Sequence, residues 1–184
     1  MGTVTSQQTF TLTLPDADAT QSLGERLAGY LTAGDLLILT GDLGAGKTTL
    51  TQGIGRGLGV RGAVASPTFI IAREHPSLTD GPGLVHVDAY RLSSLDEVDA
   101  LDLDTSLDEC VTVVEWGEGL VDTLSDDRLD IVLRRPHGGI TSADVDLDSA
   151  EVGERVATIT AHGERWAATD FRALCSPSPT PTEK

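Results

Sequence analysis

The stretch that most constrains the fold is residues 35–58, where an apolar run, a glycine-rich loop and a helical pattern follow one another. The run 35–40, DLLILT, is short and almost wholly apolar, which is typical of a strand buried in a parallel sheet. The loop 41–48 has the pattern Gly-x4-Gly-Lys-Thr, and the segment after it carries an apolar residue at every fourth position. A strand, this loop and a helix, in that order, form a phosphate-binding loop.

This loop predicts a nucleotide as ligand. Its backbone N–H groups are expected to surround the α- and β-phosphates, with the positive end of the following helix behind them. Lys47 would reach the β- and γ-phosphates, and Thr48 would offer its hydroxyl to Mg²⁺. The loop therefore predicts a nucleotide bound together with Mg²⁺. The residues predicted to bind them are Gly41, Asp42, Leu43, Gly44, Ala45, Gly46, Lys47, Thr48 and Thr49.

Lys47 is unusual in this chain, because of the 13 basic residues only Lys47 and Lys184 are lysines. A compact ammonium and a planar guanidinium are not interchangeable at such a site. The bias that favours arginine elsewhere in the sequence has spared position 47, which agrees with a role in binding phosphate.

The rest of the chain alternates strand and helix patterns. A helix is expected after Asp16 or Asp18, with leucines on one face, and a late helix over residues 164–175. This alternation predicts an α/β protein with a three-layer P-loop NTPase fold and a mainly parallel central sheet. One ATPase domain would span residues 1–175, and the Pro/Ser/Thr-rich tail 176–184 is expected to be disordered. Strands are predicted at 9–14, 35–40, 68–74, 84–90, 111–116, 129–135 and 156–163.

Two helical stretches have unusual compositions. Gly53, Gly55 and Gly57 each weaken the helix after the loop by roughly 1 kcal/mol relative to alanine, so the sequence predicts its position better than its rigidity. Residues 96–109 are strongly acidic and follow Ser94, which makes a capping box with Glu97. Two short helices are expected there, with either a solvated acidic face or a face that docks on a protein.

Candidate catalytic residues follow from strand ends and from one loop. Asp88 and Glu115 stand at the ends of apolar strands, where ligands of parallel sheets gather, and either could hold the metal. Thr68, in a loop that precedes a strand, could sense the γ-phosphate as switch loops do. Trp116 is interpreted as a core or edge aromatic, and His86 as a buried core histidine rather than a catalyst.

The bulk composition limits the partners. The net charge is −16 and the pI is about 4.3, which argues against direct binding to nucleic acid phosphates. No apolar run approaches the ~20 residues of a membrane span, and the N-terminus shows no secretory pattern, so a cytoplasmic protein without membrane contact is expected. Cys110 and Cys175 have no metal-ligand spacing and are expected to be free thiols.

Four short motifs together resemble one known family. The segments GDLGAGKTT, SPTF, HVDAYRL and VEWGE occur in the order and at the spacings of the TsaE (YjeE) family, ATPases of the tRNA threonylcarbamoyladenosine pathway. The resemblance covers roughly residues 10–163. It implies ATP and Mg²⁺ as cofactors and TsaB and TsaD as partners, which attach the threonylcarbamoyl group to adenosine 37 of ANN-decoding tRNAs.

The resemblance also implies roles for individual residues. Lys47 and Thr48 would bind phosphate and Mg²⁺, and Thr68 would be the switch-like threonine. Asp88 would be the acidic residue of the D-x-Y-R motif and Glu115 a carboxylate linked to the metal, with Trp116 beside it. Arg155 is the candidate for a basic residue near the nucleotide. ATP hydrolysis would reset the TsaB–TsaD complex, with weak or no direct tRNA binding.

Two other functions stay open at this point. A small-molecule kinase would need an acceptor pocket and a lid with arginines, and Arg134 and Arg135 are the only adjacent pair. A non-hydrolysing nucleotide-binding adaptor would lack a catalytic carboxylate, which Asp88 and Glu115 argue against.

Overall fold

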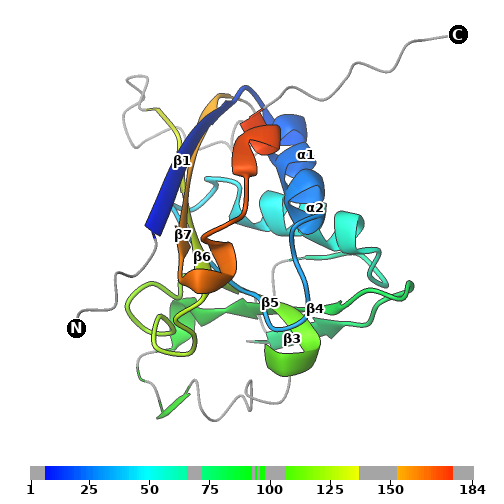
Figure 1. Cartoon of the computed structure of the whole chain (residues 1–184). Helices are drawn as coiled ribbons and strands as arrows, with labels where there is room; N and C mark the ends of the chain where they lie inside the picture. Colours follow the sequence, from blue (N-terminus) through cyan, green and yellow to red (C-terminus); the bar gives the residue numbers. More distant parts are fainter. Residues whose placement is uncertain are drawn as a thin grey trace, which may run out of the picture.

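The computed structural model describes residues 7–65, 72–92, 94, 96–97, 107–136 and 153–175. In these residues a seven-stranded sheet has the order β1-β7-β6-β2-β5-β4-β3, and helices α1 (Ala17–Ala28) and α2 (Lys47–Leu58) cover one of its faces (Figure 1). The strands are β1 Gln7–Leu14, β2 Leu36–Thr40, β3 Ala72–His75, β4 Gly83–Asp88, β5 Cys110–Glu115, β6 Arg128–Arg134 and β7 Arg155–His162.

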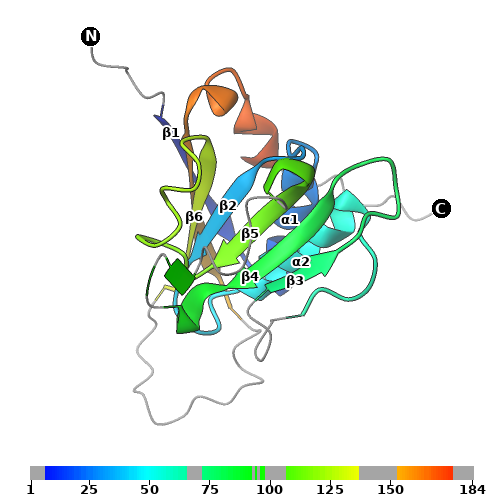
Figure 2. The same cartoon turned by 90° about the horizontal axis from the view of Figure 1, so that it is seen from below.

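The centre of the sheet is parallel, as the sequence predicts. β6, β2, β5 and β4 lie side by side and run in one direction (Figure 2). The edges are antiparallel, since β1 pairs with β7, β7 with β6, and β3 with β4. β2 is in the middle of the sheet, so the loop that leaves its carboxyl end lies beside the carboxyl ends of β4 and β5. The expected α/β class and P-loop NTPase-like fold are confirmed.

Alternate residues of the central strands serve two different layers. Leu84 of β4 belongs to the larger apolar cluster, which includes the inner faces of α1 and α2. Val85 and Val87 belong to a smaller cluster on the other face of the sheet. Short segments rather than long helices cover that second face in the described residues. Their apolar side chains are Leu92, Leu107, Leu120, Val121 and Leu124.

The two helices are in contact through glycines. A side chain at Gly24 of α1 would meet the backbone of Ile54 at 2.7 Å and of Gly53 at 2.9 Å. A side chain at Gly53 would run into the backbone of Gln21. Glycine is therefore required by the close approach of the two backbones, although it is a poor helix former. This explains residues that look unfavourable in the isolated α2 sequence.

The C-terminal segment differs from the single helix predicted over residues 164–175. It forms two 3-10 turns, η3 (Glu164–Trp166) and η4 (Phe171–Cys175), and the Asp170 side chain accepts a hydrogen bond from the Arg172 N–H at the start of the second turn. Phe171 is fully buried, and its ring centroid lies 5.2 Å from that of Phe10 and 5.8 Å from that of Trp166. The single helix expected over residues 164–175 is therefore wrong.

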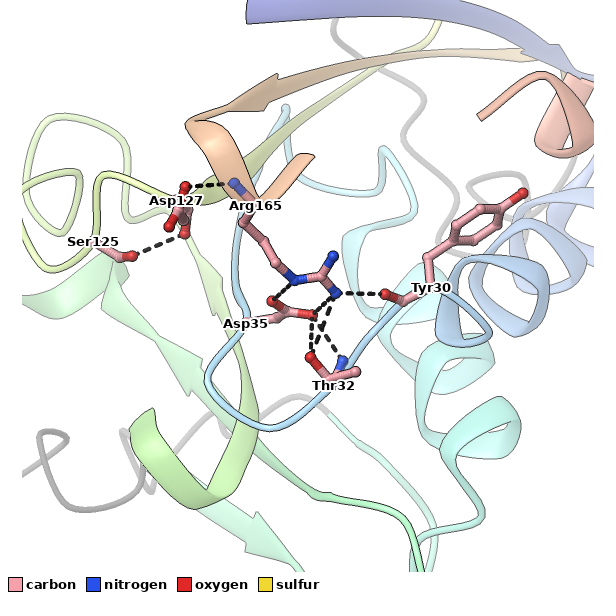
Figure 3. A network of polar contacts seen from close by, with 6 residues as sticks. All are labelled: Tyr30, Thr32, Asp35, Ser125, Asp127 and Arg165. Atoms are coloured by element: carbon pink, nitrogen blue, oxygen red, sulfur yellow. Dashed lines mark hydrogen bonds and ion pairs between the residues drawn. The ribbon is translucent and has the colours of Figure 1, made fainter. Parts of the chain in front are cut away.

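Arg165 ties this segment to the start of β2 (Figure 3). Its guanidinium contacts both carboxylate oxygens of the buried Asp35, at 3.2 and 3.0 Å, and donates to the Tyr30 carbonyl at 2.9 Å. Its backbone N–H donates to the Asp127 carboxylate at 3.0 Å. Asp35 is buried while Arg165 is partly exposed, and loss of Arg165 would leave the buried carboxylate without its cation. The amino end of β2 is thus fixed at the end of the strands opposite to the glycine-rich loop.

Some expectations fall partly or wholly outside the described residues. The predicted strand 68–74 appears as β3, which begins at Ala72, and residues 66–71 before it are not described. The predicted tail 176–184 is not described either. The predicted capping box of Ser94 and Glu97 is described in part: the Glu97 N–H donates to Ser94 Oγ at 3.3 Å. None of the helices in the described part is long and apolar enough to cross a membrane.

The glycine contact yields a stability prediction. Gly53→Ala should raise helix propensity yet lower the free energy of unfolding by about 1–3 kcal/mol, because the new methyl group overpacks the α1–α2 interface. The melting temperature should fall by roughly 2–4 °C for each kcal/mol lost from the free energy of unfolding. Ser22→Ala in α1 is the matched control, since it adds no atom to the interface and should leave the melting temperature nearly unchanged. A Gly53→Ala variant as stable as the control would contradict the packing argument.

Candidate nucleotide site

The glycine-rich loop connects β2 to α2 and leaves the start of α2 open. Gly46 caps α2 in the left-handed region, at φ 105°, and within the described residues the helix has no side-chain cap. A side chain at Gly41 would collide with the Leu133 carbonyl of β6. Leu43, at the tip of the loop, is 89% exposed. The unpaired N–H groups and the helix dipole make this end of α2 suited to bind an anion.

Lys47 is folded back onto its own loop. Its ammonium donates to the carbonyls of Gly41 at 2.6 Å and Asp42 at 3.0 Å, and lies 4.0 Å from the centre of the Trp116 ring. Burial lowers the pKa of Lys47 below its usual value, while the carboxylates of Glu115, Asp88 and Asp42 act in the opposite sense. The protein therefore keeps a cation here among acceptors that phosphate oxygens could replace.

Thr48 is joined directly to Glu115. The Thr48 hydroxyl donates to Glu115 Oε1 at 3.1 Å, and this connects the first turn of α2 with the last residue of β5. Glu115 is only 3% exposed. His86 of β4 contacts the same oxygen, with 2.8 Å between its Nε2 and Glu115 Oε1. A buried carboxylate needs such partners, because without them its desolvation is expensive.

Asp88 has a different role in the described residues. It lies beside Glu115 in the parallel register of β4 and β5, so both strands end in a carboxylate, as predicted. Its Oδ1, however, accepts a hydrogen bond from the Tyr90 N–H at 3.0 Å and caps the short turn η1 (Ala89–Arg91). Asp88 is thus near enough to influence Lys47 electrostatically, whereas Glu115 holds the threonine of the loop.

Trp116 and Tyr90 form an aromatic wall beside Lys47. Their ring centroids are 5.3 Å apart in an edge-to-face arrangement. Trp116 has φ 62°, a left-handed conformation that costs a non-glycine residue roughly 1–2 kcal/mol, and its N–H donates to the Leu39 carbonyl at 3.0 Å. This turn directly after Glu115 brings the Trp116 ring over the Lys47 ammonium. The sequence left open whether Trp116 is a core or edge aromatic, and in the structure its ring lies beside the lysine of the loop.

One more predicted residue can be located. Arg155, at the start of β7, is buried against the loop, since a side chain at Gly46 would lie 3.2 Å from Arg155 Nε. Arg155 also donates to the Gly153 carbonyl at 2.7 Å. Thr68 lies outside the described residues, so its switch role stays a prediction.

His86 is the residue whose role sequence reasoning missed. It is fully buried, as expected for a core histidine, but its ring contacts Glu115 rather than apolar neighbours alone. The strand pattern held the signal: in β4 the residues Leu84, His86 and Asp88 share one face, the face turned toward α2. Any residue two positions before Asp88 therefore approaches the same site.

The donors present fit Mg²⁺. The Thr48 hydroxyl and the Glu115 carboxylate are hard oxygen ligands within 3.1 Å of each other, beside a loop suited to phosphate. No group of three or more His, Cys, Asp or Glu side chains in the described residues could hold a metal by itself. Mg²⁺ in proteins usually keeps several waters and takes one or two carboxylates together with phosphate oxygens.

The comparisons with known proteins decide the family. A model of the family described as threonylcarbamoyl adenosine biosynthesis protein TsaE matches residues 14–140. The chain belongs to the TsaE family. The residues matched run from the last residue of β1 to beyond β6, so they include the glycine-rich loop, Asp88 and Glu115. The resemblance read from the four short motifs is confirmed.

Relatives in the TsaE family extend the match over most of the chain. The tRNA threonylcarbamoyladenosine biosynthesis protein TsaE of Streptomyces coelicolor is 59% identical over 155 residues, which cover 84% of this chain and 98% of the relative. The protein of the same name from Bacillus subtilis is 38% identical over 151 residues, covering 81% and 84%. The crystal structure of Bacillus subtilis YdiB is similar with a TM-score of 0.60 and 31% identity, covering 95% of both chains.

The position of Lys47 leads to a binding prediction. Lys47→Ala should weaken ADP and ATP binding by roughly 10–100-fold, because a charged hydrogen bond to the β- and γ-phosphates is lost. Lys47→Arg is the matched variant that keeps the charge, and it should also bind weakly, since a planar guanidinium cannot take the place of the ammonium within the loop. Isothermal titration calorimetry measures both. Unchanged affinity in Lys47→Ala would remove this lysine from the phosphate site.

The Thr48–Glu115 contact leads to a separate prediction. Thr48→Ala should weaken nucleotide binding more in the presence of Mg²⁺ than in its absence, because the hydroxyl is the loop's candidate ligand for the metal. Thr48→Ser keeps the hydroxyl and should restore most of the Mg²⁺-dependent affinity. The measurement is a calorimetric titration of ADP with Mg²⁺ and with excess chelator. Equal losses under both conditions would show that Thr48 does not act through the metal.

Proposed function

We propose that this chain is a Mg²⁺-dependent ATPase required for threonylcarbamoylation of adenosine 37 in ANN-decoding tRNAs, and that ATP hydrolysis resets a TsaB–TsaD complex. The observation that carries the proposal is the triad of Lys47, Thr48 and Glu115, in which a phosphate-binding loop is hydrogen-bonded to a buried carboxylate at the end of β5. The names of the family and of the relatives supply the pathway.

Each residue has a defined task in this proposal. The open N–H groups at the start of α2 and the Lys47 ammonium bind the phosphates, and Thr48 and Glu115 hold the metal. Mg²⁺ held by these two residues would supply positive charge to the phosphates. Glu115 orients the attacking water and accepts its proton, with Thr68 as the candidate sensor of the γ-phosphate. Asp88 is the second carboxylate, and it keeps the Tyr90 turn in place beside the site.

The proposed ATPase that resets a partner complex is favoured over a small-molecule kinase. A kinase needs an acceptor pocket beside the phosphates. The described residues do contain a cavity of about 280 Å³, but it lies along the carboxyl half of α2, lined by Gln52, Gly55, Arg56 and the loop after the helix, and none of residues 41–49 lines it. With a net charge of −16, the chain is expected to meet the pathway in the cytoplasm through its protein partners and to bind tRNA weakly.

The test is steady-state phosphate release with purified TsaB and TsaD added stepwise. We expect slow hydrolysis by the chain alone and a marked rise when both partners are present, because partner contacts would complete the site around Glu115 and Thr68. The partners should also raise the affinity of the chain for ATP. ATP should raise the affinity of the chain for the partners by the same factor. A rate that is high in isolation and indifferent to the partners would favour the kinase.

Glu115→Gln is the control for chemistry in the same assay. The amide keeps the size of the side chain and should retain Mg²⁺-free nucleotide binding, while turnover falls about 100-fold or more because the base is lost. Asp88→Asn is the matched second variant. If Asp88→Asn abolished turnover while Glu115→Gln preserved it, the catalytic carboxylate would be Asp88. If the wild-type chain released no phosphate with any combination of partners, the non-hydrolysing nucleotide-binding adaptor would be the function that the result supports.

A further inference from the structure

His86 is a buried polar residue to which the proposed function gives no task. Its side chain is completely shielded from solvent, and its Nε2 lies 2.8 Å from Glu115 Oε1. The same oxygen accepts the Thr48 hydroxyl at 3.1 Å. Oε1 is therefore held from two sides, by β4 and by the first turn of α2. The second oxygen of Glu115, Oε2, takes part in neither bond.

The surroundings of the ring determine which nitrogen carries the proton. Nδ1 of His86 is buried and has no hydrogen-bond partner in the part of the chain that the structure describes. A proton on Nδ1 alone would leave a buried donor without an acceptor and would place the Nε2 lone pair against the carboxylate. With the proton on Nε2, the ring donates to Oε1 and only the Nδ1 acceptor is left unpaired. The network thus assigns the Nε2–H tautomer.

We propose that His86 is a positioning residue for Glu115. It fixes the rotation of the carboxylate through Oε1, so that Oε2 stays available to the metal or to its water, while the Thr48 hydroxyl keeps its lone pairs for the metal. This inference rests on the proposed Mg²⁺-dependent nucleotide site. Side chains that hold a metal-binding carboxylate in this way affect metal affinity or activity by about 10–100-fold when they are changed.

A purely structural role would need different contacts. The other buried histidine, His75 on β3, contacts the backbone instead, with 3.2 Å between its Nδ1 and the Arg61 carbonyl. His86 instead lies opposite Val113 in the β4–β5 register, two residues before the Asp88–Glu115 pair. The two buried histidines therefore provide a comparison within one protein, one near the loop and one away from it.

The experiment uses two substitutions that differ in where they place an amide nitrogen. The amide nitrogen of His86→Gln falls near the position of Nε2 and can still donate to Glu115, whereas that of His86→Asn falls near Nδ1 and cannot. The first readout is the gain in ADP affinity that Mg²⁺ produces, measured by calorimetry with Mg²⁺ and with excess chelator. The second is kcat and KM for ATP with the partners present. Thermal unfolding of each variant reports the fold, and His75→Asn is the control for loss of a buried histidine.

The expected result is a loss in His86→Asn that His86→Gln rescues. His86→Asn should lower the Mg²⁺-dependent gain in ADP affinity and kcat by about tenfold or more, with Mg²⁺-free ADP affinity nearly unchanged. His86→Gln should lie closer to wild type in both. His75→Asn should lower the melting temperature without changing the Mg²⁺-dependent gain.

Two results would overturn the role of His86. One is a Mg²⁺-dependent gain in His86→Asn equal to that of wild type, and the other is an equal loss in the Gln and Asn variants. Because the binding readout needs no turnover, it decides this role even if the wild-type chain releases no phosphate, a result that would count against the ATPase proposal alone. Wild-type hydrolysis together with unaffected His86 variants would reject only the positioning role.

Discussion

The charge on Lys47 is the constraint around which the rest of the structure is arranged. A buried ammonium is unfavourable unless it has acceptors and nearby negative charge. The loop supplies the Gly41 and Asp42 carbonyls, and the carboxylates of Asp88 and Glu115 come from two neighbouring parallel strands. The left-handed turn at Trp116 adds an aromatic face. Glycines are needed in the loop because the backbone must turn tightly around that cation and leave its N–H groups open.

The parallel centre of the sheet explains why these groups meet. β2, β4 and β5 run in the same direction. The loop after β2 and the carboxylates that end β4 and β5 therefore lie together at the carboxyl ends of these strands. Alternation along each strand then selects a face: His86 and Glu115 are turned toward α2, while Val85, Val87 and Val114 face the other layer. The Thr48–Glu115–His86 chain is a consequence of topology combined with strand periodicity.

Different contacts stabilise the opposite, amino-terminal end of the central strands. The Arg165–Asp35 ion pair and the cluster around Phe171 anchor the start of β2 and the C-terminal segment far from the loop. The contact of α1 with α2 through Gly24 and Gly53 brings the helix of the loop close to its neighbour. The nucleotide site is therefore formed by the central strands and α2. Glycines that weaken an isolated helix are favourable in α2 because they allow its close contact with α1.

The sequence by itself determined the phosphate-binding loop, the class of fold, most strands to within a few residues and the two carboxylates at strand ends, because each of these follows from local pattern and spacing. Only the tertiary structure decided which carboxylate bonds to Thr48, that His86 shares that carboxylate, and that the segment after β7 forms two short turns rather than one helix. Such choices depend on contacts between residues far apart in the chain. Helix propensity and strand alternation are local properties, whereas the partner of a buried polar group is settled by packing.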